Sequence, residues 1–264
     1  MASFKANNYC LDLSKKTYVM GILNVTPDSF SDGGKYNDVD SAVARALEIQ
    51  SQGADILDIG AQSTKPGFKK ISADEELKRL LPVLEAIKGK INIPISIDTF
   101  YPKVADTAIG LGADIINDVM GWDFEGMLKI ASKTKCGLVI MHVGSQINDI
   151  KPFFISRLKK ATEYFIDKER LCFDPGIGFG KNYEDDVQAI KQINEYKIDG
   201  CAVLIGASKK RLIGHFCDDD TIEKRLPGTI AVNAVAALNG ANIVRVHDVI
   251  QTVNAMRLVD ELKF

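Results

Sequence analysis

Short apolar runs alternate with amphipathic stretches along the whole chain. The runs are only a few residues long and are rich in β-branched residues and leucine, which is typical of buried parallel strands. They cover residues 18–23, 56–59, 93–97, 114–116, 138–141, 171–173, 202–205 and 243–246. Eight strand–helix units of similar length favour an α/β fold, a closed (β/α)8 TIM barrel, over an open doubly wound sheet.

The stretches between these runs have helical spacing. One apolar face is marked by Leu77, Leu80, Leu81, Leu84 and Ile87, a shorter one by Val104, Ala108 and Leu111, and the last by Val249, Val253, Met256 and Val259. Ser72 followed by Glu75 predicts a capping box at the start of the first of these helices. Gly53, Gly112 and Gly240 each precede a strand and suit helix C-termini, because glycine accepts positive φ easily.

The length and composition fit one barrel domain spanning residues 1–264. The chain has 264 residues, close to the ~250 typical of this fold, and 46% of them are hydrophobic. A net charge of −2 gives no basic footprint for nucleic acid. Five cysteines without a Cys-x-x-Cys pair suggest neither a zinc site nor a disulfide framework. No signal peptide or apolar run of ~18 residues is present, so we expect a cytoplasmic protein without a membrane partner.

Nearly every apolar run ends in a polar side chain. The set comprises Asn24, Asp58, Asp98, Asn117, His142, Asp174, Ser208 with Lys210, and Arg245 with His247. A single strand-end Asp or Asn usually caps a helix or makes a turn. In a barrel, however, all of these side chains reach the same face, where active sites lie. Together they predict one pocket lined by both charge signs.

The chemistry of this set predicts a pocket with two sides. Asp98, Asn117 and Asp174 can read a fused heterocycle that carries amide and amino groups. On the other side, cations from Lys210, Arg245 and His247 suit a phosphate or pyrophosphate group. For His142, a satisfied structural role is the more common one for a histidine in an apolar setting, with catalysis as the alternative.

Three loops extend this interpretation. Residues 24–34 and 60–67 are dense in hydroxyls, Pro and Gly, and they resemble lids that close over a substrate; long solvated connections are the alternative. The glycines of 174–181 do not fit the dinucleotide fingerprint, because Lys181 stands where its third glycine belongs. Residues 206–210 lack the spaced glycine of a P-loop. We therefore expect no dinucleotide fold and no P-loop.

The ordered motifs resemble those of the dihydropteroate synthases, from about residue 21 to 249. The matching segments are 24–34, 58–67, 96–99, 116–119, 141–142, 174–181, 206–211 and 245–248. The resemblance implies a transferase of folate biosynthesis that joins 6-hydroxymethyl-7,8-dihydropterin pyrophosphate to p-aminobenzoate, releasing pyrophosphate. It also implies Mg²⁺ as cofactor and a homodimer formed through outer helices late in the chain. Sulfonamides compete with p-aminobenzoate in this family.

The same resemblance assigns roles to residues. It places Asp98, Asn117, Asp174 and Lys210 on the pterin, with Met141 as a further substrate contact. It places Asn24, Arg245 and His247 on the pyrophosphate, with Asn24 also reaching Mg²⁺. Around p-aminobenzoate it places Phe30, Thr64, Lys65, Pro66, Phe179 and Ser208. Asp98, Asp174, Lys210, Arg245 and His247 form the expected catalytic group.

The sequence departs from the family pattern at three places. The second loop usually reads Glu-Ser-Thr-Arg-Pro-Gly, whereas this chain has Gln62 and Lys65 at the first and fourth positions. Lysine keeps the charge of arginine but loses its planar fork. Val143 stands where Met is usual, and the segment from His142 to Asp174 is shorter than in most relatives, so we expect a trimmed loop or helix there.

The implied reaction is a substitution at the exocyclic methylene of the pterin, with pyrophosphate leaving before the amine bonds. Arg245, His247, Lys65 and Mg²⁺ would neutralise the leaving group, while Asp174 and Lys210 would stabilise the pterin. Three alternatives stay open. They are a pterin-binding methyltransferase domain, a class I aldolase with Lys210 as Schiff-base nucleophile, and a pterin-binding protein that has lost activity.

Overall fold

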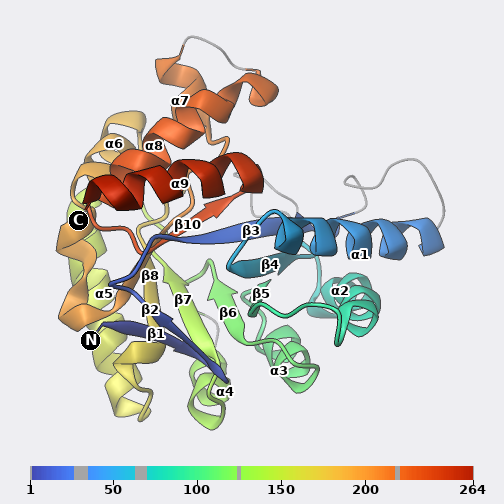
Figure 1. Ribbon diagram of the computed structural model, residues 1–264. Helices are drawn as coiled ribbons and strands as arrows, with labels where there is room; N and C mark the ends of the chain where they lie inside the picture. Colours follow the sequence, from blue (N-terminus) through green and yellow to red (C-terminus); the bar gives the residue numbers. More distant parts are fainter. Residues whose placement is uncertain (1, 27–34, 63–69, 124–125, 218–220, 264) are drawn as a thin grey trace.

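Eight parallel strands form a closed barrel in the computed structural model, which describes residues 2–26, 35–62, 70–123, 126–217 and 221–263 (Figure 1). The strands are β3 (Tyr18–Asn24), β4 (Ile56–Gly60), β5 (Ile95–Asp98), β6 (Ile115–Asp118), β7 (Gly137–Met141), β8 (Leu171–Asp174), β9 (Ala202–Ile205) and β10 (Ile243–Val246). They pair in chain order, and β10 closes onto β3. Every predicted run is a barrel strand with bounds within two residues, so the predicted (β/α)8 TIM barrel is confirmed.

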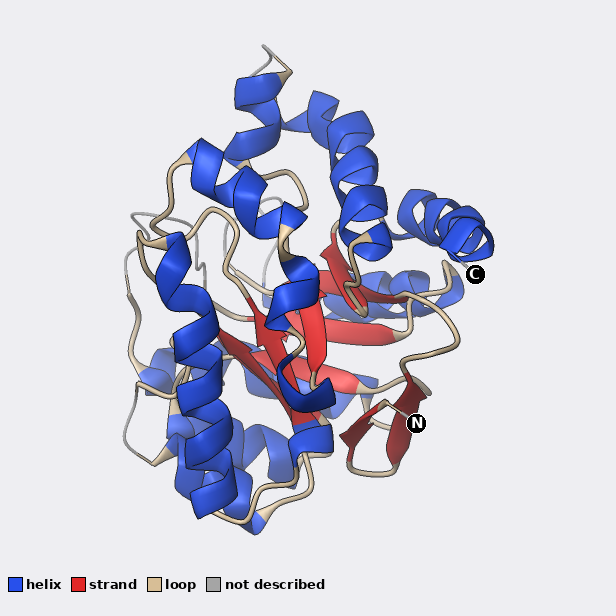
Figure 2. Cartoon of the chain, turned by 90° about the vertical axis from the view of Figure 1, so that its left-hand side faces the viewer, coloured by secondary structure: helices blue, strands red, loops and turns tan. Residues whose placement is uncertain are grey.

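Helices surround the barrel on its outside (Figure 2). They are α1 (Lys35–Ser51), α2 (Ala73–Ile87), α3 (Pro102–Gly110), α4 (Met127–Lys133), α5 (Ile150–Glu163), α6 (Tyr183–Lys191), α7 (Arg211–Phe216), α8 (Leu226–Leu238) and α9 (Val249–Lys263). Short 3-10 segments cover Ile147–Asp149, Lys168–Arg170, Ile193–Tyr196, Ile198–Gly200 and Ile222–Arg225. The segment after β7 contains a helix of 14 residues, α5.

The predicted apolar faces pack against the barrel. Leu77, Leu80, Leu84 and Ile87 of α2 are buried, and so are Val249, Val253, Met256 and Val259 of α9. Ser72 is the N-cap of α2, where its hydroxyl accepts a hydrogen bond from the Glu75 N–H at 3.2 Å. Gly53, Gly112 and Gly240 all have positive φ. The local patterns thus predicted both the helices and how they end.

An N-terminal hairpin covers one end of the barrel, and the hydrophobic pattern did not predict it. Strands β1 (Ser3–Ala6) and β2 (Tyr9–Asp12) pair antiparallel, and β1 packs against β7 and β8. Phe4 is fully buried, and a Cβ at Gly137, the first residue of β7, would lie only 2.8 Å from Phe4 Cζ. Phe4 therefore lies at the amino end of the strands, in one apolar cluster with Met20, Ile56, Ile115, Val139, Leu204 and Ile243.

The opposite end of the barrel receives the polar residues. Because the strands are parallel, their last residues lie at one edge, as the pairing of Asp98 with Asn117 and of Met141 with Asp174 shows. The apolar core lies mainly between the barrel and its helices. Among the described helices, none is long and apolar enough to cross a membrane.

Candidate active site at the carboxyl ends of the strands

Arg245 lies at the centre of a buried charge cluster. Its Nε donates to Asp58 Oδ2 at 2.6 Å, and its Nη2 donates to Asp98 Oδ2 at 2.7 Å. These contacts join β10 to β4 and β5 across the barrel interior. The predicted division into a carboxylate side and a cation side therefore does not describe Arg245, which lies among the carboxylates. Its planar fork suits the role because it can bind two carboxylates at once.

Asp58 belongs to the predicted set of strand-end residues, but the sequence reasoning gave it no role in the site. It is fully buried, it accepts a hydrogen bond from Ser96 Oγ at 2.6 Å, and it lies 3.4 Å from Asn117 Nδ2. Its position inside a buried strand was the available signal, because a carboxylate there requires paired donors. Asp58 thus fixes both the guanidinium of Arg245 and the amide of Asn117.

Burial governs the ionisation of Asp98. It raises the pKa of this carboxyl to about 7, against the opposing effect of Arg245, while Asp58 and Glu76 raise the pKa further. Glu76 on α2 is itself buried, and burial raises its pKa to about 7. In the same cluster, burial tends to lower the pKa of Arg245, but Asp58 and Asp98 raise it more. The cluster therefore combines a permanent cation with an acid that titrates near neutrality.

A second group of predicted residues gathers at the ends of β8 and β9. Asp174 is buried, and its Oδ1 accepts a hydrogen bond from the Gly176 N–H at 2.8 Å. Burial raises the pKa of Asp174, although Gly176, Lys210 and Arg245 act in the opposite direction. Lys210 Nζ lies 4.0 Å from the centroid of the Phe179 ring. This is a cation–π arrangement, and it holds the ammonium at a partly buried position.

The ammonium of Lys210 titrates close to physiological pH. Burial lowers its pKa to about 8, and the neighbouring Arg245 lowers it too, whereas Asp174, Asp186 and Asp98 raise it. Lys210 and Arg245 therefore belong to one electrostatic group. A lysine with this pKa can donate hydrogen bonds as a cation at pH 7 and loses its charge above pH 8.

Ser208 and His247 form a separate pair at the ends of β9 and β10. Ser208 Oγ lies 3.0 Å from His247 Nδ1, and the His247 N–H donates to the same oxygen at 3.3 Å. Ser208 is buried, whereas His247 is partly exposed. A hydroxyl and an imidazole at this distance can bind one anionic oxygen together.

Asn24 and Asp98 border the same space above Gly60. A Cβ built at Gly60 would lie 3.8 Å from Asn24 Oδ1 and 3.5 Å from Asp98 Cβ. The described residues include no group of three His, Cys, Asp or Glu side chains that could hold a metal. Mg²⁺ often takes one or two protein oxygens and completes its shell with water and substrate phosphates. The exposed amide oxygen of Asn24 fits that limited role.

Met141 and His142 contribute apolar and structural contacts. Met141 is buried in a small cluster with Phe100 and Val119, against which Phe179 packs. His142 is also buried, and its ring meets the edge of Phe153 at a centroid distance of 5.2 Å. Burial lowers the pKa of His142 to about 4, so the ring is neutral at pH 7. These contacts give His142 a packing role, but its Nδ1 is buried without a hydrogen-bond partner among the described residues, so the predicted satisfied structural role is not confirmed.

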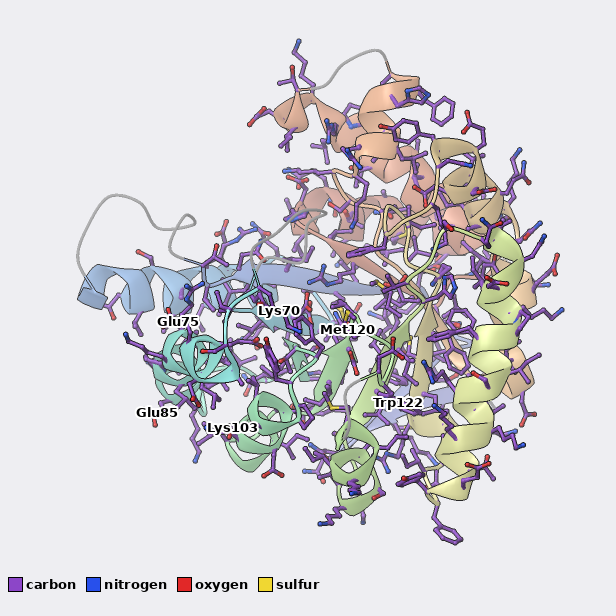
Figure 3. All side chains as sticks on the ribbon, turned by 180° about the vertical axis from the view of Figure 1, so that it is seen from behind. Lys70, Glu75, Glu85, Lys103, Met120 and Trp122 are labelled. Atoms are coloured by element: carbon purple, nitrogen blue, oxygen red, sulfur yellow. The ribbon has the colours of Figure 1, made fainter. Side chains whose placement is uncertain are left out.

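Four predicted contacts, Phe30, Thr64, Lys65 and Pro66, lie outside the described residues. The two ends of the second loop are described. Gln62 Oε1 accepts a hydrogen bond from the Ile71 N–H at 2.8 Å. Lys70, labelled in Figure 3, places its Nζ 4.8 Å from the centroid of the Phe100 ring. Gln62 therefore joins the two ends of the loop through its amide oxygen, an acceptor that the usual glutamate would also supply.

Comparison with known proteins agrees with this geometry. The model of the family described as pterin binding enzyme matches residues 20–247. The dihydropteroate synthase of Clostridium beijerinckii is 39% identical over 257 residues, covering 94% of this chain and 95% of that protein.

Solved structures give the same result. The dihydropteroate synthase from Xanthomonas albilineans, with 4-aminobenzoic acid, has a TM-score of 0.94 at 38% identity and covers 99% of this chain and 98% of that one. The enzyme from Clostridium difficile, in the presence of pteroic acid, has a TM-score of 0.92 at 41% identity, covering 96% and 98%. The chain belongs to the dihydropteroate synthase family of pterin-binding enzymes.

Proposed function

We propose that the chain condenses 6-hydroxymethyl-7,8-dihydropterin pyrophosphate with p-aminobenzoate, giving 7,8-dihydropteroate and pyrophosphate for folate biosynthesis. The observation that carries this proposal is the convergence of Asp98, Asn117, Asp174 and Lys210 at one barrel end. The support from relatives is direct, since similar structures are described with 4-aminobenzoic acid and with pteroic acid.

The pterin is held by acceptors and donors of complementary type. Asp174 accepts hydrogen bonds from N–H groups of the heterocycle, and its charge stabilises positive character that spreads into the ring as pyrophosphate departs. Lys210 and Asn117 donate to ring acceptors. Met141 and Phe179 supply apolar surface for the ring faces. Asp98 has a pKa of about 7, so it can accept hydrogen bonds as a carboxylate or donate one as a carboxylic acid.

The leaving group is bound by Asn24, Arg245 and His247, and the hydroxyl of Ser208 lies against the His247 ring at 3.0 Å. Arg245 already holds Asp58 and Asp98. It must therefore share its guanidinium with the pyrophosphate or exchange one carboxylate for it. Arg245 acts on both substrate halves in this arrangement. Its replacement is expected to weaken pterin binding as well as pyrophosphate binding, unlike the selective effect that the two-sided division implied.

Asn24 would hold Mg²⁺ through its amide oxygen in this proposal. When bound, Mg²⁺ would supply positive charge that offsets the charge developing on pyrophosphate. Arg245 and His247 would act on the pyrophosphate from the end of β10. The arylamine of p-aminobenzoate needs no general base to attack, because it is neutral at pH 7 and its lone pair is free; after the C–N bond forms, its surplus proton passes to solvent. The main barrier therefore lies in pyrophosphate departure, which precedes bonding of the amine.

Phe30, Thr64, Lys65, Pro66, Phe179 and Ser208 surround p-aminobenzoate in this proposal. Its basis for the first four is the family resemblance alone. Lys65, with Gln62 before it, changes the loop chemistry relative to the family pattern. Lys65 offers a point charge to a carboxylate instead of a bidentate fork.

A second copy of the chain covers the outer helices in the proposed homodimer. Val235 and Leu238 on α8 and Leu258 and Leu262 on α9 are large apolar side chains exposed to solvent. Such exposure on neighbouring helices is typical of an interaction surface. Light scattering of the purified protein measures the molar mass, and a mass of one chain at micromolar concentration rejects the dimer.

We also propose that the protein is cytoplasmic. Its five cysteines are all free thiols, as is usual in a reducing compartment.

The experiment that tests the function is release of pyrophosphate from pterin pyrophosphate, with p-aminobenzoate and Mg²⁺ each present or omitted. Turnover that requires both amine and pterin supports the synthase. Absence of pyrophosphate release with intact pterin binding rejects the synthase and leaves a binding protein, a methyltransferase or an aldolase. Trapping of a substrate on Lys210 by borohydride then identifies the aldolase. Rapid mixing without p-aminobenzoate tests the order of steps, since pyrophosphate departure that wholly requires the amine contradicts a dissociative path.

A further inference from the structure

Lys209 has a left-handed backbone conformation between two residues of the site. Its φ is +56°. Of its two neighbours, Ser208 contacts His247 and Lys210 contacts the Phe179 ring. A residue with a Cβ loses roughly 1–2 kcal/mol in this region of φ. Such strain persists only when surrounding contacts enforce it, and it concentrates at functional sites.

The start of α8 enforces this conformation from outside the barrel. The Lys209 N–H donates to Thr229 Oγ1 at 3.1 Å, and its carbonyl accepts from Arg225 Nη1 at 3.0 Å. The same hydroxyl of Thr229 donates to the Arg225 carbonyl at 2.8 Å. The backbone N–H and the carbonyl of Lys209 are thus held by Thr229 and Arg225, whose side chains are both buried. The Thr229 hydroxyl is in turn bonded to the backbone of Arg225.

Close helix packing makes these contacts possible. A Cβ at Gly228 would lie 2.3 Å from Ile213 Cγ2 of α7, so only glycine permits this approach of α8 to α7. Thr229 follows directly and is fully buried. Its hydroxyl therefore reaches the turn after β9 as a consequence of where α8 lies.

The side chain of Lys209 ties this turn to the end of β10. Its Nζ lies 3.0 Å from Asp248 Oδ1, and Asp248 follows His247 directly. Ser208 contacts His247 in the same way, at 3.0 Å. Ser208 and Lys209, in the turn after β9, thus contact His247 and Asp248, which follow β10. The left-handed residue lets Ser208 and Lys210 reach different partners.

We propose that Thr229 and Arg225 are positioning residues for the reaction. They hold the Lys209 backbone in its left-handed conformation, which directs Ser208 toward His247 and Lys210 toward Phe179. Neither touches the substrate in this proposal. The inference rests on the proposed function, because it assumes that Lys210 and His247 bind pterin pyrophosphate and that Ser208 contacts p-aminobenzoate.

The primary test is Thr229→Val, which keeps the shape of the side chain but removes the hydroxyl. We expect kcat/KM for pterin pyrophosphate to fall about tenfold, the effect of one lost buried hydrogen bond. KM for p-aminobenzoate should rise as well, because Ser208 and Phe179 surround that substrate in the proposed function. Thr229→Ser, which keeps the hydroxyl, should restore most of the loss. An unchanged Thr229→Val enzyme, or a Thr229→Ser enzyme as impaired as Thr229→Val, overturns the proposal.

A rescue experiment separates positioning from packing. In the Thr229→Val background, Lys209→Gly and Lys209→Ala both remove the contact with Asp248, but only glycine accepts φ of +56° without strain. We expect the glycine double variant to be about fivefold more active than the alanine double variant. Equal activity of the two overturns the proposal. If the Thr229→Val protein does not fold, Lys209→Gly and Lys209→Ala are compared alone, with the same expected order.

Titration calorimetry with inorganic pyrophosphate and Mg²⁺ supplies a readout independent of turnover. Thr229→Val should weaken pyrophosphate binding about tenfold relative to wild type, and Thr229→Ser should not. A wild-type protein that binds pyrophosphate without turnover contradicts the proposed function and leaves this binding comparison intact. Unchanged pyrophosphate affinity in Thr229→Val, beside normal wild-type turnover, contradicts the positioning role alone.

Discussion

The two ends of the barrel have opposite chemistry, although the same eight strands build both. At the amino ends, the hairpin β1–β2 brings Phe4 into an apolar cluster with Met20 and Ile115. At the carboxyl ends, Arg245 binds Asp58 and Asp98. One end is a closed hydrophobic layer, and the other holds several ionisable groups with shifted pKa values.

This contrast separates stability from chemistry along each strand. The hydrophobic end contributes free energy through buried area and needs no exact protonation state. At the charged end, desolvation penalises every ionised group, and paired contacts only partly offset that penalty. The pKa of Asp98 is raised to about 7 because burial disfavours its ionised form. We therefore expect substitutions at the first end to change unfolding and those at the second to change turnover.

The largest expected effect is loss of stability at the hydrophobic end. Phe4→Ala should lower the free energy of unfolding by about 3–5 kcal/mol, because it removes a fully buried ring from the cluster. Denaturant unfolding measures this, and KM for both substrates should stay within twofold. Phe165→Ala is the matched control, since that ring is 94% exposed and its loss should cost less than about 0.5 kcal/mol. A large change in KM without loss of stability would contradict the separation.

Asp174→Asn should have the complementary effect at the charged end. Turnover should fall roughly 10²–10³-fold, because the charge beside the pterin is lost. The asparagine oxygen can still accept from the Gly176 N–H, so the unfolding midpoint should hardly change. Asp118→Asn serves as the control. Asp118 also ends a strand, but its carboxylate accepts from the backbone N–H groups of Met120 and Trp122, both labelled in Figure 3. Similar losses of turnover in both variants would contradict the proposal that the charge of Asp174 stabilises the pterin.

The smallest predicted effect concerns pH and Lys210. Its pKa is lowered to about 8, so the ammonium is charged below pH 8 and loses its proton above it. If the charge binds the pterin, kcat/KM for pterin pyrophosphate should fall up to about tenfold for each pH unit above 8. Lys210→Arg keeps its charge throughout this range and should flatten that decline, even at lower activity. A decline that is identical in both proteins assigns the titration to another group.

Local patterns predicted much of the fold because the relevant forces are local. Buried parallel strands must be apolar on both faces, so runs such as 202–205 and 243–246 could be located to the residue. Ser72 and Gly53 indicated helix ends through backbone preferences that depend on few neighbours. The hairpin β1–β2 was missed because its residues show no long pattern, and it gains its stability by covering the barrel end.

Side-chain partners across the site could not be predicted in the same way. The sequence indicated that Arg245 and Asp98 share the site, because both end parallel strands. It did not indicate that Arg245 reaches Asp58 and Asp98 together, since this depends on barrel closure, which places β10 beside β3 and so near β4 and β5. The pKa values of Asp98 and Lys210 likewise depend on burial and on neighbours from other strands.

The sequence by itself therefore determined the order of the eight barrel strands, the family motifs and the end of the barrel at which the chemistry lies. These properties follow from hydrophobic periodicity and from the common direction of parallel strands. Only the tertiary structure decided which charges pair, which groups titrate near pH 7, and that Thr229 and Arg225 of a distant segment hold Lys209. The physical reason is that pairing, desolvation and backbone strain depend on atoms brought together by folding.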